Sequence, residues 1–267
     1  MNELTTAWAD WKAIKAPHIL LGDEPILASE RSRTFTANDY TEWKDVYSQP
    51  DFGKPGDTKL QLGIIPHPFC GDIKNAEIYI LMLNPGYGPH DYFAELEVLS
   101  YKEAALKNLR QEFEHRSYPF YLLNPEFAWT GGYAWWHKKL AFTIDEISKK
   151  NETDYANARK CLSQKIASIE LVPYHSTSFY DPIGWAKKLE SAKLARKFVN
   201  EYVVPKVQRN EAILIATRKV KEWNLPEHNN IIVYSSSEAR SAHLSPASRG
   251  GRAIIERLAE VNKGTIL

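Results

Sequence analysis

Four stretches of the chain concentrate hydrophobic and β-branched residues in the pattern of buried strands, at residues 77–83, 167–172, 211–216 and 230–235. Segments with helical periodicity lie between and after them, at residues 101–113, 135–149, 155–165, 184–204, 217–223 and 250–261. Alternating strands and helices favour a parallel sheet with helices on both faces. The pattern predicts an α/β fold, a three-layer α/β/α sandwich around a four-stranded parallel central sheet.

The first 60 residues lack this alternation. Tryptophans among polar spacers indicate short helices there, and the turn-rich segment 49–56 marks a boundary. We therefore expect a helical N-terminal extension over residues 1–60, packed on an α/β domain over residues 61–267.

Composition limits the class of protein. The chain has 267 residues, 43% hydrophobic and 25% charged, enough for one sizeable domain. No stretch approaches the roughly 20 apolar residues of a membrane span, and the start lacks the features of a signal peptide. We expect a soluble, cytoplasmic protein with no membrane partner.

The cysteines and histidines argue against a metal or a cofactor. Cys70 and Cys161 are the only cysteines and lie far apart, so they build neither a disulfide framework nor a four-thiolate cluster. No compact His/Asp cluster has the spacing of a metal site. We predict neither metal nor cofactor.

The net charge of +1 is unevenly distributed. Residues 151–267 hold 18 Lys/Arg against 12 Asp/Glu, and residues 1–150 hold 16 against 21. A basic half is compatible with a surface that faces phosphates. An ordinary solvated charge distribution explains it equally well, so charge supports nucleic acid only weakly.

Two polar motifs follow predicted strands. Asn84-Pro85-Gly86 comes directly after strand 77–83, and His243-Leu244-Ser245-Pro246 follows strand 230–235 after a short loop. The carboxyl ends of parallel strands are where α/β sheets place ligands. Asn-Pro-Gly alone is most often a turn, and a single histidine is most often structural. Two such motifs at strand ends favour a catalytic site.

Together the motifs resemble the two catalytic motifs of the uracil-DNA glycosylase superfamily, nearest to its single-strand-selective and mismatch-specific branches. The resemblance implies a flipped base, with Asn84 orienting the water that attacks the anomeric carbon. It implies that His243 donates a hydrogen bond to O2 of the departing base. The chain departs from the pattern at Leu244, usually proline, and at Ala247, which is too small to wedge into the base stack. The motifs contain no lysine, so we expect a monofunctional enzyme without lyase activity.

The second motif continues into a basic, glycine-containing helix start. In the mismatch-specific branch an arginine near this position contacts the opposite strand. The resemblance therefore implies DNA contacts, with the alternative that both arginines are simple surface charges. Backbone amides at a helix start also bind phosphate. The predicted DNA-binding residues are Ser245, Ser248, Arg249, Gly250 and Arg252.

Glu170 decides the predicted substrate. Single-strand-selective relatives carry an asparagine here that reads uracil, whereas this chain has Glu170-Leu-Val-Pro. A carboxylate is repelled by O4 of uracil but accepts from the amino group of cytosine. A strand-end surface charge or a salt bridge is the alternative for Glu170. Further predicted base-binding residues are Tyr87, Tyr174 and His175.

Residues 118–137 are unusually aromatic, and they either stack on an extruded base or cover the sheet, or do both. Excising ordinary cytosine would be lethal, so we hypothesise a monofunctional DNA glycosylase for a modified cytosine, hydroxymethylated or glucosylated, in phage DNA. This is an antiviral role with DNA as partner and no obligate protein partner. The alternatives are a repair glycosylase for uracil or damaged pyrimidines, and a non-catalytic module that binds a modified base or nucleic acid.

Overall fold

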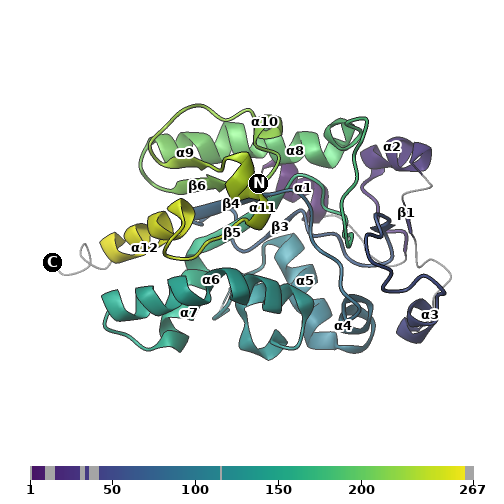
Figure 1. The fold of residues 1–267 in the computed structure, drawn as a ribbon, viewed down its shortest axis with the longest axis horizontal. Coiled ribbons are helices and arrows are strands. Elements are labelled where there is room, and N and C mark those ends of the chain that lie inside the picture. Colours follow the sequence, from purple (N-terminus) through teal and green to yellow (C-terminus); the bar gives the residue numbers. More distant parts are fainter. Residues whose placement is uncertain (1, 10–15, 31–33, 36–41, 115, 262–267) are drawn as a thin grey trace. The chain divides into compact units, whose positions relative to one another are not determined.

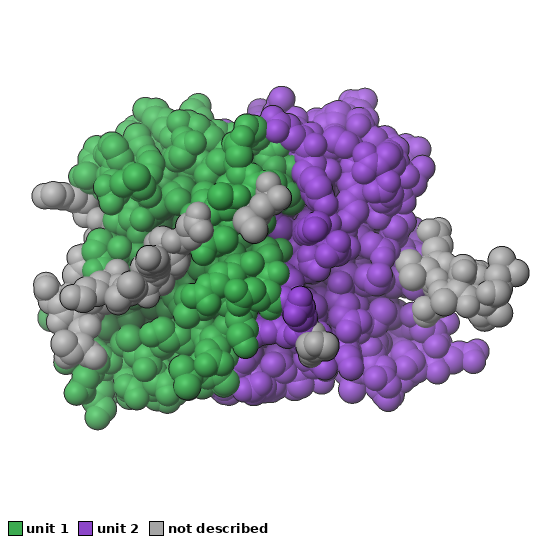
Figure 2. All heavy atoms as spheres, turned by 180° about the vertical axis from the view of Figure 1, so that it is seen from behind, with its two compact units in different colours: residues 1–69, 83–112, 170–198 green, residues 70–82, 113–169, 199–267 purple. Residues whose placement is uncertain are grey.

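The computed structural model describes residues 2–9, 16–30, 34–35, 42–114 and 116–261. The chain forms two compact units, each assembled from three segments and coloured separately in Figure 2. Unit 1 comprises residues 1–69, 83–112 and 170–198, and unit 2 comprises residues 70–82, 113–169 and 199–267. The predicted extension of residues 1–60 thus belongs to unit 1, together with two later segments that the sequence analysis assigned to the α/β domain.

The α/β class is confirmed (Figure 1). A mixed five-stranded sheet has the strand order β3-β5-β4-β6-β7. Its strands are β3 (Phe69–Cys70), β4 (Ile78–Met82), β5 (Ile166–Glu170), β6 (Ile213–Ala216) and β7 (Ile231–Val233). All of it except the end residues Phe69 and Glu170 lies in unit 2. The sequence predicted the last four strands and missed β3, because two residues between prolines and a glycine are too short for a periodic pattern.

Burial explains the centre of this sheet. Every residue of β4 and β6 is buried, and β4 pairs in parallel with β6 from Ile78 opposite Ile213 to Leu81 opposite Ala216. β7 continues the sheet in parallel on the other side of β6. Strands buried on both faces are continuous apolar runs, which is why the sequence indicated them clearly.

Local capping positions the helices of unit 2. Thr130 accepts from the Tyr133 amide at the start of α6, and Asp154 accepts from the Asn157 amide at the start of α7. The helix α12 packs on both α6 and β6. The helical elements of unit 2 are η3 (Tyr121–Leu123), η4 (Pro125–Phe127), α6 (Gly131–Lys150), α7 (Tyr155–Lys165), the π-helical turn η6 (Val199–Val203), α9 (Val204–Gln208), α10 (Val220–Trp223), α11 (Ser236–Ser241) and α12 (Arg249–Val261).

Among the described residues of unit 1, the regular secondary structure is mainly helical, with a short parallel ladder between β1 (Thr34–Phe35) and β2 (Leu60–Gln61). Trp8 is fully buried in this unit, as expected for a tryptophan of the N-terminal segment. Its helical elements are α1 (Glu3–Ala9), η1 (Leu21–Asp23), α2 (Glu24–Ser29), α3 (Trp43–Tyr47), α4 (Asp91–Glu97), α5 (Leu99–Arg110), η5 (Ala186–Lys188) and α8 (Glu190–Phe198). Within the described residues, no helix combines the length and apolarity needed to cross a membrane.

Candidate functional site

Asn84, in unit 1, has an amide group whose orientation is fixed by its neighbours. Its Nδ2 donates to the Pro85 carbonyl at 3.0 Å, to the Tyr174 carbonyl at 3.3 Å and to Ser176 Oγ at 2.9 Å. Carbonyl oxygens only accept, so the nitrogen must face them. Oδ1 accepts no hydrogen bond from any described residue. The half-buried side chain therefore offers one oriented carbonyl oxygen to a ligand or a water.

The Asn84 loop, residues 84–88, is placed by the segment that follows β5. Val172 N donates to Leu83 O at 2.9 Å, and Ser176 N donates to Pro85 O at 3.2 Å. On its other side, this segment pairs with residues 61–67 through the Gln61 amide and the His175 carbonyl. Ser176 carried no signal in the sequence, because it becomes a partner of Asn84 only through this pairing.

His175 lies in the interior beneath the Asn84 loop, with 4% of its surface exposed. Its Nδ1 is 2.8 Å from the Gly86 carbonyl and its Nε2 is 3.1 Å from the Ile65 carbonyl. Burial lowers the pKa of His175 to about 4, so the ring is neutral at pH 7 and donates to one of these carbonyls. The His67 ring packs edge-on against it at 4.5 Å.

Tyr174 is fully buried, and its hydroxyl donates to Asp23 Oδ2 at 2.6 Å. Burial, reinforced by the Asp23 carboxylate, raises the pKa of Tyr174 well above its usual value. Tyr174 and His175 thus position backbone in this structure, and neither presents a surface to a ligand. Their contact with a base stays a prediction.

Two buried carboxyl groups of α4 close the Asn84 loop from the other end. Asp91 Oδ2 accepts from the Gly88 amide at 2.8 Å, and Glu95 Oε2 accepts from the Ile65 amide at 2.7 Å. Burial raises the pKa of Asp91 to about 7 and the pKa of Glu95 well above its usual value. At least one of the two carboxyl groups therefore carries a proton in part of the molecules near neutral pH.

Glu170 is the last residue of β5 and is 8% exposed. Its backbone amide donates to the Pro68 carbonyl at 2.9 Å. A side chain this deeply buried is not a strand-end surface charge, which removes one of the alternatives for Glu170. A buried carboxyl group requires a polar partner, so a salt bridge and the reading of a base both stay open.

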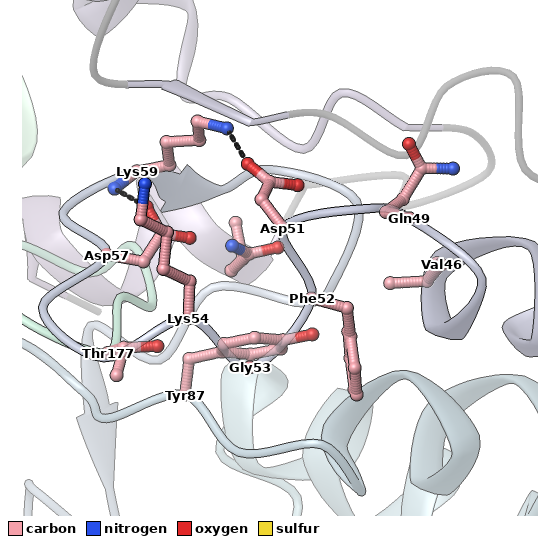
Figure 3. Close-up of a pocket in the computed structure, with 11 residues that line it drawn as sticks. Val46, Gln49, Asp51, Phe52, Gly53, Lys54, Asp57, Lys59, Tyr87 and Thr177 are labelled. Carbon is pink, nitrogen blue, oxygen red and sulfur yellow. Dashed lines mark hydrogen bonds and ion pairs between the residues drawn. The ribbon is translucent and has the colours of Figure 1, made fainter.

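Tyr87 lines a small pocket in unit 1, beside Thr177 and opposite Phe52 (Figure 3). Lys59 forms an ion pair with Asp51 at its rim. The volume of about 30 Å³ holds about one water molecule, far less than a base. Stacking of Tyr87 on a flipped base stays a prediction that requires the pocket to widen.

His243, in unit 2, has an exposed imidazole on a fixed backbone. Its neighbours Ala242 and Leu244 are each 1% exposed, and its carbonyl oxygen accepts from the Tyr234 hydroxyl. The imidazole makes no hydrogen bond to any described residue. The imidazole is thus accessible to a ligand, and its role in catalysis stays a prediction.

The helix α6 holds the His243 loop, residues 242–246, through hydrogen bonds to carbonyl groups on either side of His243 in the sequence. Lys139 Nζ donates to the Ser241 carbonyl, and Thr143 Oγ1, one turn further along α6, donates to the Leu244 carbonyl at 2.5 Å. These two contacts bracket His243. The sequence did not indicate a role for Lys139 or Thr143. Their spacing of four residues places them on one face of a helix but does not show which segment that face contacts.

The glycines at the start of α12 allow the His243 loop to approach that helix. A Cβ on Gly251 would lie 1.9 Å from the Ser245 carbonyl oxygen, and one on Gly250 would lie 2.5 Å from the Tyr234 hydroxyl. The Gly251 amide donates to Ser248 Oγ at 3.0 Å. Close packing therefore explains both glycines, and phosphate binding at Gly250 stays a prediction.

The other predicted DNA-binding residues have partners within unit 2. Ser248 Oγ donates to the Ser245 carbonyl at 2.8 Å, and Arg252 Nη1 donates to the Ala247 carbonyl at 2.9 Å. Arg249 forms a bidentate ion pair with Glu238, at 2.9 and 2.7 Å, and lowers the pKa of Glu238 to about 2. Glu238 completes a capping box at the start of α11. Contacts of these residues with DNA stay predictions.

The aromatic segment 118–137 divides between interior and surface. Trp129 is 40% exposed and Trp135 is 36% exposed. Its buried rings include Phe120, Tyr121, Phe127, Tyr133 and Trp136. The segment thus covers the interior and also leaves two indole rings at the surface.

In the part of the chain that the structure describes, no three His, Cys, Asp or Glu side chains are grouped to hold a metal ion. Comparison of the chain with protein-family models, with curated proteins and with solved structures finds no match. Any functional assignment therefore depends on the geometry of the Asn84 and His243 loops.

Proposed function

We propose that the chain is a monofunctional DNA glycosylase that removes a modified cytosine and leaves an abasic site. The observation that carries this proposal is the amide of Asn84. Its nitrogen is bound by three acceptors while its oxygen is open. An amide fixed in this way is suited to orient a water molecule without deprotonating it.

In the proposed reaction, the bond between the sugar C1′ and the base nitrogen breaks, and its electron pair leaves with the base. The water oxygen adds to C1′ and one of the water's protons is released to solvent, while the departed base anion takes up a proton from solvent. Asn84 Oδ1 accepts a hydrogen bond from the attacking water. His243 donates to O2 of the base as negative charge develops there, a contribution of about 100-fold to 1000-fold in rate if it resembles an oxyanion-hole donor.

The burial of Glu170 supports cytosine as the base, because a buried carboxyl group is an effective acceptor for an exocyclic amino group. A hydroxymethyl or glucosyl group on the cytosine would distinguish phage DNA from the host's own DNA. The finer architecture, a three-layer sandwich in which four of the five strands run parallel, and action in the cytoplasm belong to the same proposal.

An alkali-cleavage assay tests the reaction. The substrates are matched oligonucleotides, single-stranded and duplex, that contain uracil, cytosine, 5-hydroxymethylcytosine or its glucosylated form. We expect strand breaks only at a modified cytosine, and at least about 100-fold slower excision for Asn84→Ala and for His243→Ala. His228→Ala is a matched control for His243→Ala and should cut like the parent.

Each of the other possible results would support one of the alternative functions. Breaks at uracil would make the protein a repair glycosylase and would remove the proposed role of Glu170. A gain of uracil excision only in Glu170→Asn would support the cytosine assignment, since an amide can donate to O4. If no substrate is cut while modified DNA is still bound, the protein is a binding module and the proposed reaction is wrong.

A further inference from the structure

One side of α6 is aromatic, cationic and open to solvent. Trp135 is 36% exposed and Phe142 is 70% exposed. Spacings of three, four and seven residues place these rings on one side of the helix together with two lysines. We call this surface the Trp135 face, and it comprises Trp135, Lys138, Lys139 and Phe142 of α6 with the nearby Arg218.

The described residues do not neutralise the positive charge of the Trp135 face. None of their carboxylates lies within 4 Å of any of its three cations. Lys139 Nζ lies 5.2 Å from the Trp135 ring centroid and donates to the Ser241 carbonyl, while Arg218 donates to the Arg240 carbonyl at 3.3 Å. Carbonyl groups leave the charge of a cation in place. Desolvation, with Arg218 and Lys138 nearby, lowers the pKa of Lys139.

The Trp135 face adjoins the His243 loop. Lys139 bonds the carbonyl two residues before His243, and Thr143 of the same helix bonds the carbonyl of Leu244 directly after it. A molecule bound along this side of α6 would therefore lie next to the His243 loop. Both contacts are within unit 2.

The chemistry of the face selects among occupants. Tryptophan, phenylalanine and arginine are enriched in protein interfaces, so the rings alone do not select an occupant, whereas lysine is depleted there. Three cations without a carboxylate partner among the described residues complement a polyanion. Duplex DNA covers the faces of its bases. A single strand offers both unpaired bases, which stack on exposed aromatic rings, and phosphates for the cations.

We infer that the Trp135 face binds single-stranded DNA, with Trp135 stacked on a base next to the nucleotide at His243. The inference rests on the proposed function for the role of His243, but strand binding can be measured without base excision. It makes a single strand, or a locally opened duplex, the preferred substrate.

Fluorescence anisotropy with an unmodified, labelled single strand of about 16 nucleotides tests the inference directly. Trp135→Ala should weaken binding about tenfold, because a stacked ring is lost, and Trp135→Phe should restore most of the affinity. The duplex form should bind more weakly than the single strand, and Trp135→Ala should change its affinity by less than about twofold.

A second variant tests the charge without touching the aromatic packing. Lys138→Glu should weaken binding and reduce the slope of log affinity against log salt by about 1 to 2. Lys149→Glu is the matched control on the same helix, because Lys149 is paired with Asp145 at 2.7 Å and Glu146 at 3.1 Å. It should bind like the parent. Circular dichroism verifies that all variants are folded.

The outcomes separate the inference from the proposed function. If the parent excises a modified base and both Trp135→Ala and Lys138→Glu bind and cut like it, the inference is wrong and the glycosylase stands. If no base is excised but strand binding depends on Trp135 and Lys138, the face is supported and the reaction is lost. Competition by polyglutamate as strong as by single-stranded DNA, with no effect of Trp135→Ala, would assign the face to an acidic protein instead and overturn the inference.

Discussion

The Asn84 loop of unit 1 and the His243 loop of unit 2 each present one polar group that has no hydrogen-bond partner among the described residues, but the two loops are held by different interactions. Beneath the Asn84 loop lie buried titratable side chains, chiefly His175 and Asp91. The His243 loop is held by hydroxyl groups, by an amine and by backbone contact with Gly251. The position of Asn84 should therefore depend on protonation, and that of His243 on packing distance.

Replacing Gly251 by alanine should have the largest effect. The added Cβ meets backbone atoms of Ser245 at 1.9 and 2.4 Å, so the His243 loop itself must move. We expect a loss of about 1 to 3 kcal/mol in the free energy of unfolding, in spite of alanine's better helix propensity. Excision should slow more than about tenfold, because a misplacement of about 1 Å is enough to disrupt the geometry of a catalytic group.

Gly131→Ala is the control for this prediction. Gly131 also lies in the first turn of a long helix, but a Cβ there meets no atom within 4 Å. Urea denaturation should find it at least as stable as the parent, and single-turnover excision should find it as active. If the Gly251 and Gly131 variants have the same stability and the same excision rate, the His243 loop accommodates the methyl group. Close packing against Gly251 then does not fix the position of the loop.

Asp91→Asn should reveal the dependence of the Asn84 loop on protonation. Burial raises the pKa of Asp91 from its ordinary 3.8 to about 7, so between these values the folded state retains a proton that the unfolded state loses. Stability contributed by Asp91 is complete below pH 3.8 and is lost as the pH rises to about 7. Asparagine preserves the shape and the acceptor for Gly88 but does not titrate.

The free energy of unfolding of Asp91→Asn relative to the parent should therefore rise between about pH 4 and pH 7 and level off above. The expected gain at pH 8 is of the order of a few kcal/mol, since each pKa unit corresponds to about 1.4 kcal/mol. His175 acts in the opposite direction, because its lowered pKa costs stability as the pH falls from 6.5 to about 4. Comparing the variant with the parent at each pH cancels that contribution. A difference that does not vary with pH would mean that Asp91 does not titrate in this range.

Sequence patterns identified the strands β4 to β7 and most long helices because burial on both faces and helical periodicity are local signals. The start of the chain's last helix was predicted within one residue, at 250 against the observed Arg249. The helix α11 was missed, although Ser235 and Glu238 form the Ser-x-x-Glu signature of a capping box. Helix 184–204 was predicted as one element, but the structure divides it into η5, α8 and η6.

The candidate site was less accessible to sequence reasoning. Asn84 and His243 were identified because each follows a strand, which is a local feature. Their partners Ser176 and Thr143 are 92 and 101 residues away from the groups they bind, so only the folded chain brings them together. His175 was predicted to line a base pocket because it is close to Glu170 in sequence. Proximity in sequence does not show which way the ring points, and in the structure the ring is buried.

Glu238→Gln should have the smallest effect, and it tests whether the ion pair with Arg249 contributes to the His243 loop beyond the packing at Gly251. Glutamine can still accept from the Ser235 amide, so the capping of α11 is preserved while the charge is lost. The pair is largely exposed, with 48% and 34% of the two side chains accessible, so the free energy of unfolding should fall by less than about 1 kcal/mol. Because Arg249 lowers the pKa of Glu238 to about 2, the parent's advantage should be constant near neutral pH and disappear as the pH falls from 4.5 towards 2.

Glu211→Gln is the matched control, because Arg209 and Glu211 also form a bidentate pair at the surface, at 2.6 and 3.0 Å, away from the His243 loop. The two variants should lose similar stability in urea denaturation, whereas only Glu238→Gln should slow excision, by about twofold, since a surface pair constrains its surroundings only weakly. If excision by Glu238→Gln slows as much as by Gly251→Ala, the ion pair and not the close packing fixes His243. In that case the two loops would not differ in the way proposed above. Charged groups would position both the Asn84 loop and the His243 loop.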